Sequence, residues 1–182
     1  HDFVYHDLPK MMIFAGNPDT DRIGDVLRKN PERLKLVMTM LATMRGIPQI
    51  FAGDEMMFTS KDLSQGHGGL RVDFPGGWAG DERDLFTAEG RTGLDKELFD
   101  HAQRLFQWRR TKPVIHNGRT MHFLSRDNTY AYFSYDDTDA GFVFINNSRG
   151  RKQTHGSNYG ESADGRCAVS STHLQLPARP LV

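Results

Sequence analysis

A strand, a helix and a second strand follow one another in the first third of the chain, and this order constrains the fold most strongly. Residues 11–15, Met-Met-Ile-Phe-Ala, form a short run with two hydrophobic faces, which is typical of a buried strand. Residues 47–53, Ile-Pro-Gln-Ile-Phe-Ala-Gly, form a second run whose proline falls at the start, where a strand tolerates it. Two strands joined through a helix predict a parallel pair with a right-handed crossover.

The segment between these strands carries the signals of a helix that begins at Pro31. Asn30 can cap the helix, proline suits its first position, and Glu32 favours the positive end of the helix dipole. Gly46 predicts its end. Apolar residues recur between these points at three- and four-residue steps: Leu34, Val37, Met38, Leu41 and Met44.

A second helix is predicted from Leu94 to Arg110, with Pro113 ending it. A glycine-rich stretch precedes this helix, from Lys61 to Gly90, and we expect a loop there. Loops of such length within a domain are usually functional or disordered.

After Pro113 the hydrophobic pattern changes to short aromatic and β-branched runs, at residues 121–124, 129–135 and 141–146. Polar turns separate these runs, so they predict an antiparallel meander, and residues 172–176 resemble a further strand. The boundary between the two patterns falls near residues 112 to 119. The predicted fold class is therefore α/β over residues 1–112 followed by all-β over residues 113–182, with the weakest pattern after residue 149.

Charge and composition exclude several classes of function. Lysine plus arginine number 23 and aspartate plus glutamate also number 23, so the chain lacks the basic surface that a nucleic-acid partner requires. No apolar run approaches the roughly 20 residues that span a bilayer. The single cysteine, Cys167, and the scattered histidines predict no metal site. A nucleotide-binding domain is disfavoured because no phosphate loop or dinucleotide fingerprint is present.

Polar side chains follow both predicted strands, at the point where each strand ends. They are Asn17, Asp19, Asp21 and Arg22 after the first strand, and Asp54 and Glu55 after the second. Because parallel strands direct their carboxyl ends to one edge, we expect both clusters on one face. Carboxylates beside an arginine suit hydrogen bonding to sugar hydroxyls, whereas the alternative for Asp19 and Asp21 is a purely structural role in turns. Trp78 suits either stacking on a sugar ring or anchoring of its loop.

Residues 13–22, 46–55 and 68–78 carry patterns that resemble those of one known family. Residues 13–22, Ile-Phe-Ala-Gly-Asn-Pro-Asp-Thr-Asp-Arg, resemble the motif Phe-x-x-Asn-His-Asp-x-x-Arg, and residues 46–55 resemble the segment Gly-x-Pro-x-Ile-x-x-Gly-x-Glu, both of the α-amylase family. Residues 68–78, Gly-Gly-Leu-Arg-Val-Asp-Phe-Pro-Gly-Gly-Trp, are most similar to the neopullulanase and cyclomaltodextrinase branch. The resemblance extends over residues 1 to 147.

The resemblance implies strand 7, helix 7, strand 8 and helix 8 of a (β/α)₈ TIM barrel, followed by an antiparallel β-sandwich. A whole barrel needs roughly 250 residues, so the chain is expected to be a C-terminal fragment. The implied activity is retaining hydrolysis of α-1,4-glucosidic bonds in starch-derived oligosaccharides, pullulan or cyclodextrins, without a cofactor. The nucleophile and the general acid are implied to lie on earlier strands, so we expect the fragment alone to be inactive. The alternative is a catalytically inactive carbohydrate-binding or interaction fragment. The resemblance is compatible with a homodimer of the full-length enzyme and with the bacterial periplasm or cytoplasm.

The resemblance gives Asp19 the catalytic role, because the aspartate at this motif position binds sugar hydroxyls and stabilises the transition state. The implied substrate-binding or site-supporting residues are Asn17, Arg22, Asp54, Glu55, Arg71, Asp73 and Trp78. The chain departs from the motif at Pro18, where the family has histidine. Proline removes an imidazole that would bind the same hydroxyls and also removes a backbone donor.

Overall fold

The computed structural model describes residues 3–152 and 168–171, and the chain divides into two compact units. One unit, here the α/β unit, contains residues 12–42 and 47–108. The other unit, here the sheet unit, contains residues 1–11, 43–46 and 109–182. Within the described ranges no helix is both long enough and apolar enough to cross a membrane.

The α/β unit contains the predicted strand, helix and strand. β1 (Met12–Phe14) and β2 (Ile47–Gln49) pair in parallel, with Met12 opposite Ile47 and Phe14 opposite Gln49, and α2 (Pro31–Thr43) lies between them in the sequence. The parallel pair is therefore confirmed. The predicted burial of both strands is wrong, since the exposed fractions of Met12, Phe14 and Ile47 are 56%, 46% and 54%. In the described part of the chain this sheet has only two strands, which leaves these side chains uncovered.

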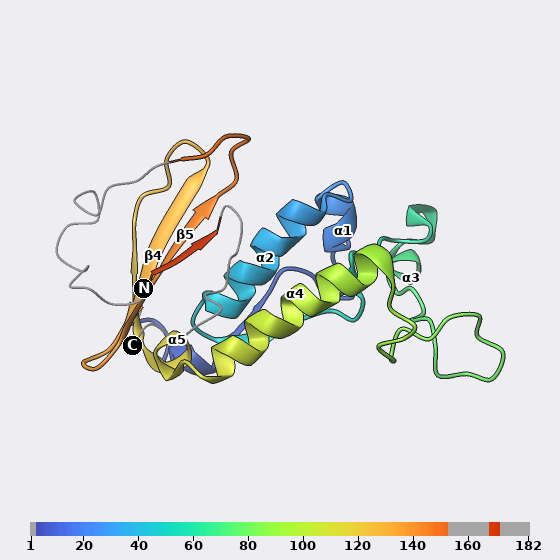
Figure 1. Cartoon of the computed structure of the whole chain (residues 1–182), viewed down its shortest axis with the longest axis horizontal. Helices are drawn as coiled ribbons and strands as arrows, with labels where there is room; N and C mark the ends of the chain where they lie inside the picture. Colours follow the sequence, from blue (N-terminus) through green and yellow to red (C-terminus); the bar gives the residue numbers. More distant parts are fainter. Residues whose placement is uncertain (1–2, 153–167, 172–182) are drawn as a thin grey trace. The chain divides into compact units, whose positions relative to one another are not determined.

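Two long helices form the core of the α/β unit. The Asn30 Oδ1 atom accepts a hydrogen bond from the Arg33 N–H at 3.0 Å, as expected of a capping residue. α2 lies beside α4 (Gly93–Arg110), where the Lys35 Nζ atom is 2.6 Å from the Glu97 Oε1 atom (Figure 1). The helices bury one apolar face each: Leu34, Met38, Leu41 and Ala42 on α2, and Leu98, Ala102 and Leu105 on α4.

Several short helical turns were absent from the sequence-based prediction. They are α1 (Ile23–Val26), η2 (Asp54–Met56), η3 (Leu63–Gln65) and α3 (His67–Leu70). The last two lie in the stretch predicted to be a loop, and α3 contains two glycines despite their low helix propensity. Tertiary contacts outweigh that propensity, because Leu70 is buried and the Lys61 N–H donates to the Gly69 carbonyl at 2.9 Å.

The sheet unit begins with η1 (Leu8–Lys10) and continues after α4 with α5 (Pro113–Asn117). Two residues separate α4 from α5, and Pro113 is the first residue of the new helix. Its strands are β3 (Arg119–His122), β4 (Thr129–Tyr135), β5 (Ala140–Asn146) and β6 (Ala168–Ser171), hydrogen-bonded in that order. β3, β4 and β5 form the predicted antiparallel meander, and β4 and β5 are its long members (Figure 1). β6 pairs with β5 in parallel, contrary to the expectation of a wholly antiparallel sheet. The strand predicted at residues 172–176 lies outside the described residues, and the β-sandwich stays a prediction.

Candidate functional site

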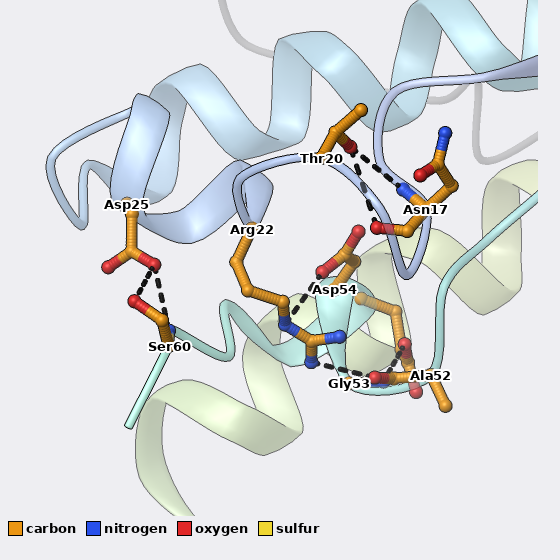
Figure 2. Close-up of polar contacts among 9 residues, drawn as sticks. Asn17, Thr20, Arg22, Asp25, Ala52, Gly53, Asp54 and Ser60 are labelled. Carbon is orange, nitrogen blue, oxygen red and sulfur yellow. Dashed lines mark hydrogen bonds and ion pairs between the residues drawn. The ribbon is translucent and has the colours of Figure 1, made fainter. Parts of the chain in front are cut away.

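Arg22 joins the segments that follow β1 and β2 (Figure 2). Its Nη2 atom donates to the Ala52 carbonyl at 2.7 Å, and its Nε atom lies 3.5 Å from the Asp54 Oδ1 atom. Its guanidinium carbon lies 4.2 Å from the ring centre of Phe51, a favourable cation–π distance. The side chains of Arg22 and Asp54 are buried, so this ion pair is shielded from water. The two polar clusters predicted from the sequence therefore leave the same end of the β1–β2 pair.

Burial shifts the pKa of the Asp54 carboxyl group. Burial raises the pKa of Asp54 to about 6, although the neighbouring Arg22 charge lowers it, and the charge of Glu55 raises it further. Burial also raises the pKa of Glu55, whose Oε2 atom accepts a hydrogen bond from the Gly53 N–H at 2.9 Å. The effect of burial on the pKa of Asp54 is therefore larger than the opposite effect of its ion pair with Arg22, whose atoms are 3.5 Å apart. Asp54 is consequently a carboxyl group that changes charge close to neutral pH.

Close packing holds these two segments in place. An ideal Cβ atom built on Gly16 would lie 2.6 Å from the Asp54 Oδ2 atom, so the carboxylate occupies the space of a side chain at position 16. Farther along, the Asp25 Oδ2 atom accepts hydrogen bonds from the Ser60 N–H and hydroxyl groups, both at 2.7 Å (Figure 2). The segments that follow β1 and β2 are therefore packed and hydrogen-bonded against each other.

Asn17 shapes the loop that presents Asp19. The Asn17 Oδ1 atom accepts a hydrogen bond from the Asp19 N–H at 2.8 Å, and the Thr20 hydroxyl oxygen accepts one from the Asn17 N–H at 3.2 Å. This is an Asx turn, the structural role that the sequence suggested for the neighbouring aspartates. The oxygen of the Asn17 amide is therefore already engaged within the loop.

Asp19 lies at the exposed end of this loop, and two side chains from the segment around α3 bind its carboxylate. The Arg71 Nη2 atom is 3.0 Å and the His67 Nδ1 atom 3.2 Å from the same oxygen, Oδ1. The hydrogen bond with His67, and then that with Arg71, lowers the pKa of Asp19. Asp19 is therefore ionised at neutral pH, and within the described residues its Oδ2 atom has no hydrogen-bond partner. Such an oxygen can accept hydrogen bonds from the hydroxyl groups of a neutral ligand.

The structure does not join the remaining candidates to this cluster. Trp78 is 82% exposed, and its backbone N–H donates to the Asp81 Oδ2 atom at 3.2 Å. Asp73 is exposed and makes no hydrogen bond or ion pair with another described residue. His67 is the contact that sequence reasoning missed. The sequence feature that indicates this contact is the position of His67 four residues before Arg71, which places both side chains on one face of a helical turn.

The site has no arrangement suited to a resident metal. In residues 3–152 and 168–171, no three His, Cys, Asp or Glu side chains lie together in a way that could hold a metal ion. The described side chains at this end of β1 and β2 include carboxylates, a guanidinium group and an imidazole.

Comparison with known proteins supports the resemblance found in the sequence. The family model described as "Alpha amylase, catalytic domain" matches residues 5–149. A maltogenic α-amylase from Bacillus acidopullulyticus is 28% identical over 139 residues, which cover 74% of this chain and 21% of that protein. This chain thus spans about a fifth of the length of that relative.

Solved structures show the same fold. A cyclomaltodextrinase superposes with a TM-score of 0.61 at 22% identity, covering 78% of this chain and 22% of that one. The α-amylase from H. orenii superposes with a TM-score of 0.57 at 22% identity, covering 74% of this chain and 29% of that one. The family prediction is confirmed by the match over residues 5–149: the chain belongs to the α-amylase catalytic-domain family.

Proposed function

We propose that this chain is the part of a retaining α-glucan hydrolase that supplies the transition-state-stabilising aspartate, Asp19. The proposed substrates are α-1,4-linked glucans, namely starch-derived oligosaccharides, pullulan or cyclodextrins. The single observation that carries this proposal is the exposed Asp19 carboxylate, held through one oxygen at the end of β1 in the segment that resembles the family motif. A maltogenic α-amylase among its relatives is consistent with this substrate class.

The proposed role of Asp19 is electrostatic. In glycoside hydrolysis the sugar ring gains positive charge in the transition state, and a fixed carboxylate hydrogen-bonded to ring hydroxyls stabilises that charge. Retention of configuration also requires a nucleophile and a general acid about 5 Å apart. We assign neither of these roles to Asp19. The chain by itself is accordingly expected to bind a glucan without cleaving it.

The buried residues have a supporting role in this proposal. Arg22 and Asp54 are too deeply buried to contact a ligand, so we propose that they position the loop that carries Asp19. Glu55 shares their segment and reinforces it through its bond to Gly53. Arg71 acts on the substrate through Asp19, whereas Asp73 and Trp78 are exposed and are proposed to contact the glucan directly.

The test is a calorimetric titration of the 182-residue chain with maltoheptaose. Chromatography of the sugar after long incubation then detects any hydrolysis. We expect saturable binding, no hydrolysis, and binding weakened about ten- to a hundredfold by Asp19→Asn. Asp21→Asn is the matched control, since it removes an exposed aspartate charge two positions away. Equal affinities of the two variants, or no binding by the unmodified chain, would contradict the proposal.

The alternative, a carbohydrate-binding fragment without a catalytic role, draws on the exposure of Trp78. An exposed aromatic ring provides a flat apolar surface on which a sugar ring can stack. If this alternative holds, Trp78→Ala weakens maltoheptaose binding more than Asp19→Asn does. Leu124→Ala serves as the control, because Leu124 is equally exposed, at 80%, but not aromatic.

A further inference from the structure

His67 contacts the central residue of the site although it lies 48 positions further along the chain. Its Nδ1 atom and the Arg71 Nη2 atom lie 3.2 Å and 3.0 Å from the same Asp19 oxygen. His67 and Arg71 are also the two charged or titratable side chains that face the Asp19 carboxylate in the described structure. Both come from one short segment, residues 67–71.

The backbone of this segment is shaped to present the two side chains. His67 is the first residue of α3 and Arg71 follows its last, so the two side chains lie on one face of the turn. Gly66 has a φ of +57°, which favours glycine, and turns the chain into α3. An ideal Cβ atom on Gly69 would lie 1.8 Å from the Asp62 carbonyl oxygen. A glycine is therefore needed at position 69 for α3 to pack so closely.

An exposed aspartate requires hydrogen bonds to fix its carboxylate. Asp19 is 69% exposed at the side chain, so packing does not restrain rotation about its Cβ–Cγ bond, which is intrinsically broad. Two donors on Oδ1 restrict that rotation and direct Oδ2 away from them. Fixing a binding group before the ligand arrives reduces the entropy lost on binding.

We propose that His67 is a positioning residue for Asp19: together with Arg71 it holds Oδ1 and leaves Oδ2 available to a glucan hydroxyl. This inference rests on the proposed function. In the tautomer that carries its proton on Nδ1, His67 donates to the Asp19 carboxylate.

The experiment compares His67→Ala with His67→Asn in the 182-residue chain. The Asn amide nitrogen lies where the imidazole Nδ1 atom lies, so asparagine can restore the hydrogen bond. Carbon-detected NMR follows the titration of the Asp19 carboxyl group, and calorimetry gives the maltoheptaose affinity. His6→Ala is the control, because it removes an exposed histidine that belongs to the sheet unit.

We expect His67→Ala to raise the pKa of Asp19 toward its ordinary value of 3.8 and to weaken maltoheptaose binding about tenfold. His67→Asn is expected to recover most of both effects, and His6→Ala to change neither. A second pair of variants tests the placement of α3 with His67 retained. Gly69→Ala should reproduce the His67→Ala result, whereas Gly68→Ala, whose new methyl group meets nothing within 4 Å, should not.

Two results would overturn the positioning role. One is an unchanged Asp19 titration in His67→Ala, which would show that the contact does not act on the carboxylate. The other is a shifted titration with an unchanged maltoheptaose affinity, which would make the contact purely structural. Failure of the unmodified chain to bind maltoheptaose, with the titration shift intact, would instead refute the proposed function and with it the role of His67 toward a glucan.

Discussion

Buried Asp54 is expected to contribute less to the stability of the α/β unit at neutral pH than in mild acid. Burial raises the pKa of this carboxyl group from an ordinary 3.8 to about 6. A carboxyl group with a raised pKa binds its proton more tightly in the folded state than in the unfolded state. Its contribution to stability is therefore complete below the unfolded pKa and is lost as the pH rises through the folded pKa.

The size of this loss follows from the difference between the two pKa values. Each pKa unit corresponds to about 1.4 kcal/mol, so the shift of Asp54 corresponds to about 3 kcal/mol of unfolding free energy. The loss occurs between about pH 4 and about pH 7, since the ionised form dominates in the folded state above that range. Asp54→Asn keeps the shape of the side chain but cannot ionise, so it should not show this loss.

The assay is urea denaturation across this pH range, monitored by far-ultraviolet circular dichroism. The unfolding free energy of Asp54→Asn should equal that of the unmodified chain in mild acid and exceed it by about 3 kcal/mol at neutral pH. Asp21→Asn controls for the loss of an exposed charge and should follow the unmodified chain. Parallel pH profiles for Asp54→Asn and the unmodified chain would show that the buried environment does not shift this carboxyl group.

Three further outcomes are expected from denaturation experiments. Arg22→Met leaves the Asp54 carboxylate buried without its counter-charge and should cost about 3 to 5 kcal/mol at neutral pH; a cost below about 1 kcal/mol would argue against the ion pair. Leu34→Ala should cost about 2 to 5 kcal/mol and the exposed Val26→Ala under about 0.5 kcal/mol, and equal costs would contradict the placement of the core. Burial lowers the pKa of His101, which faces Lys35, Arg104 and Glu32, so stability is lost as the pH falls below 6.5. His101→Phe should abolish that acid-side loss, and an unchanged profile would refute it.

Local patterns in the sequence predict much of the α/β unit correctly. The Asn30 cap, the apolar positions of α2 and the parallel pairing of β1 with β2 follow from rules that act over a few residues or one crossover. The common end for the two polar clusters follows from the same pairing. The exposure of Met12 and Phe14 cannot be predicted from these local patterns. It depends on which elements cover the strands and not on the strands themselves.

The parts that sequence reasoning misses depend on contacts between distant positions. α3 contains glycines that disfavour helix, and its position depends on the close approach of Gly69 to Asp62. β6 pairs in parallel with β5, and nothing within residues 168–171 specifies that direction. The contact of His67 with Asp19 spans 48 positions, and the four-residue spacing of His67 and Arg71 indicates a shared helical face but not the aspartate that both contact.

The absence of room between Gly16 and Asp54 has a consequence for how this family diverges. Because the Asp54 carboxylate fills the volume of a Cβ atom at position 16, Gly16 cannot gain a side chain while a residue as large as aspartate occupies position 54. Homologous sequences should therefore show covariation at these two sites, with any larger residue at 16 accompanied by a smaller one at 54. Mutational paths that enlarge position 16 before position 54 has become smaller would pass through an intermediate with a steric clash.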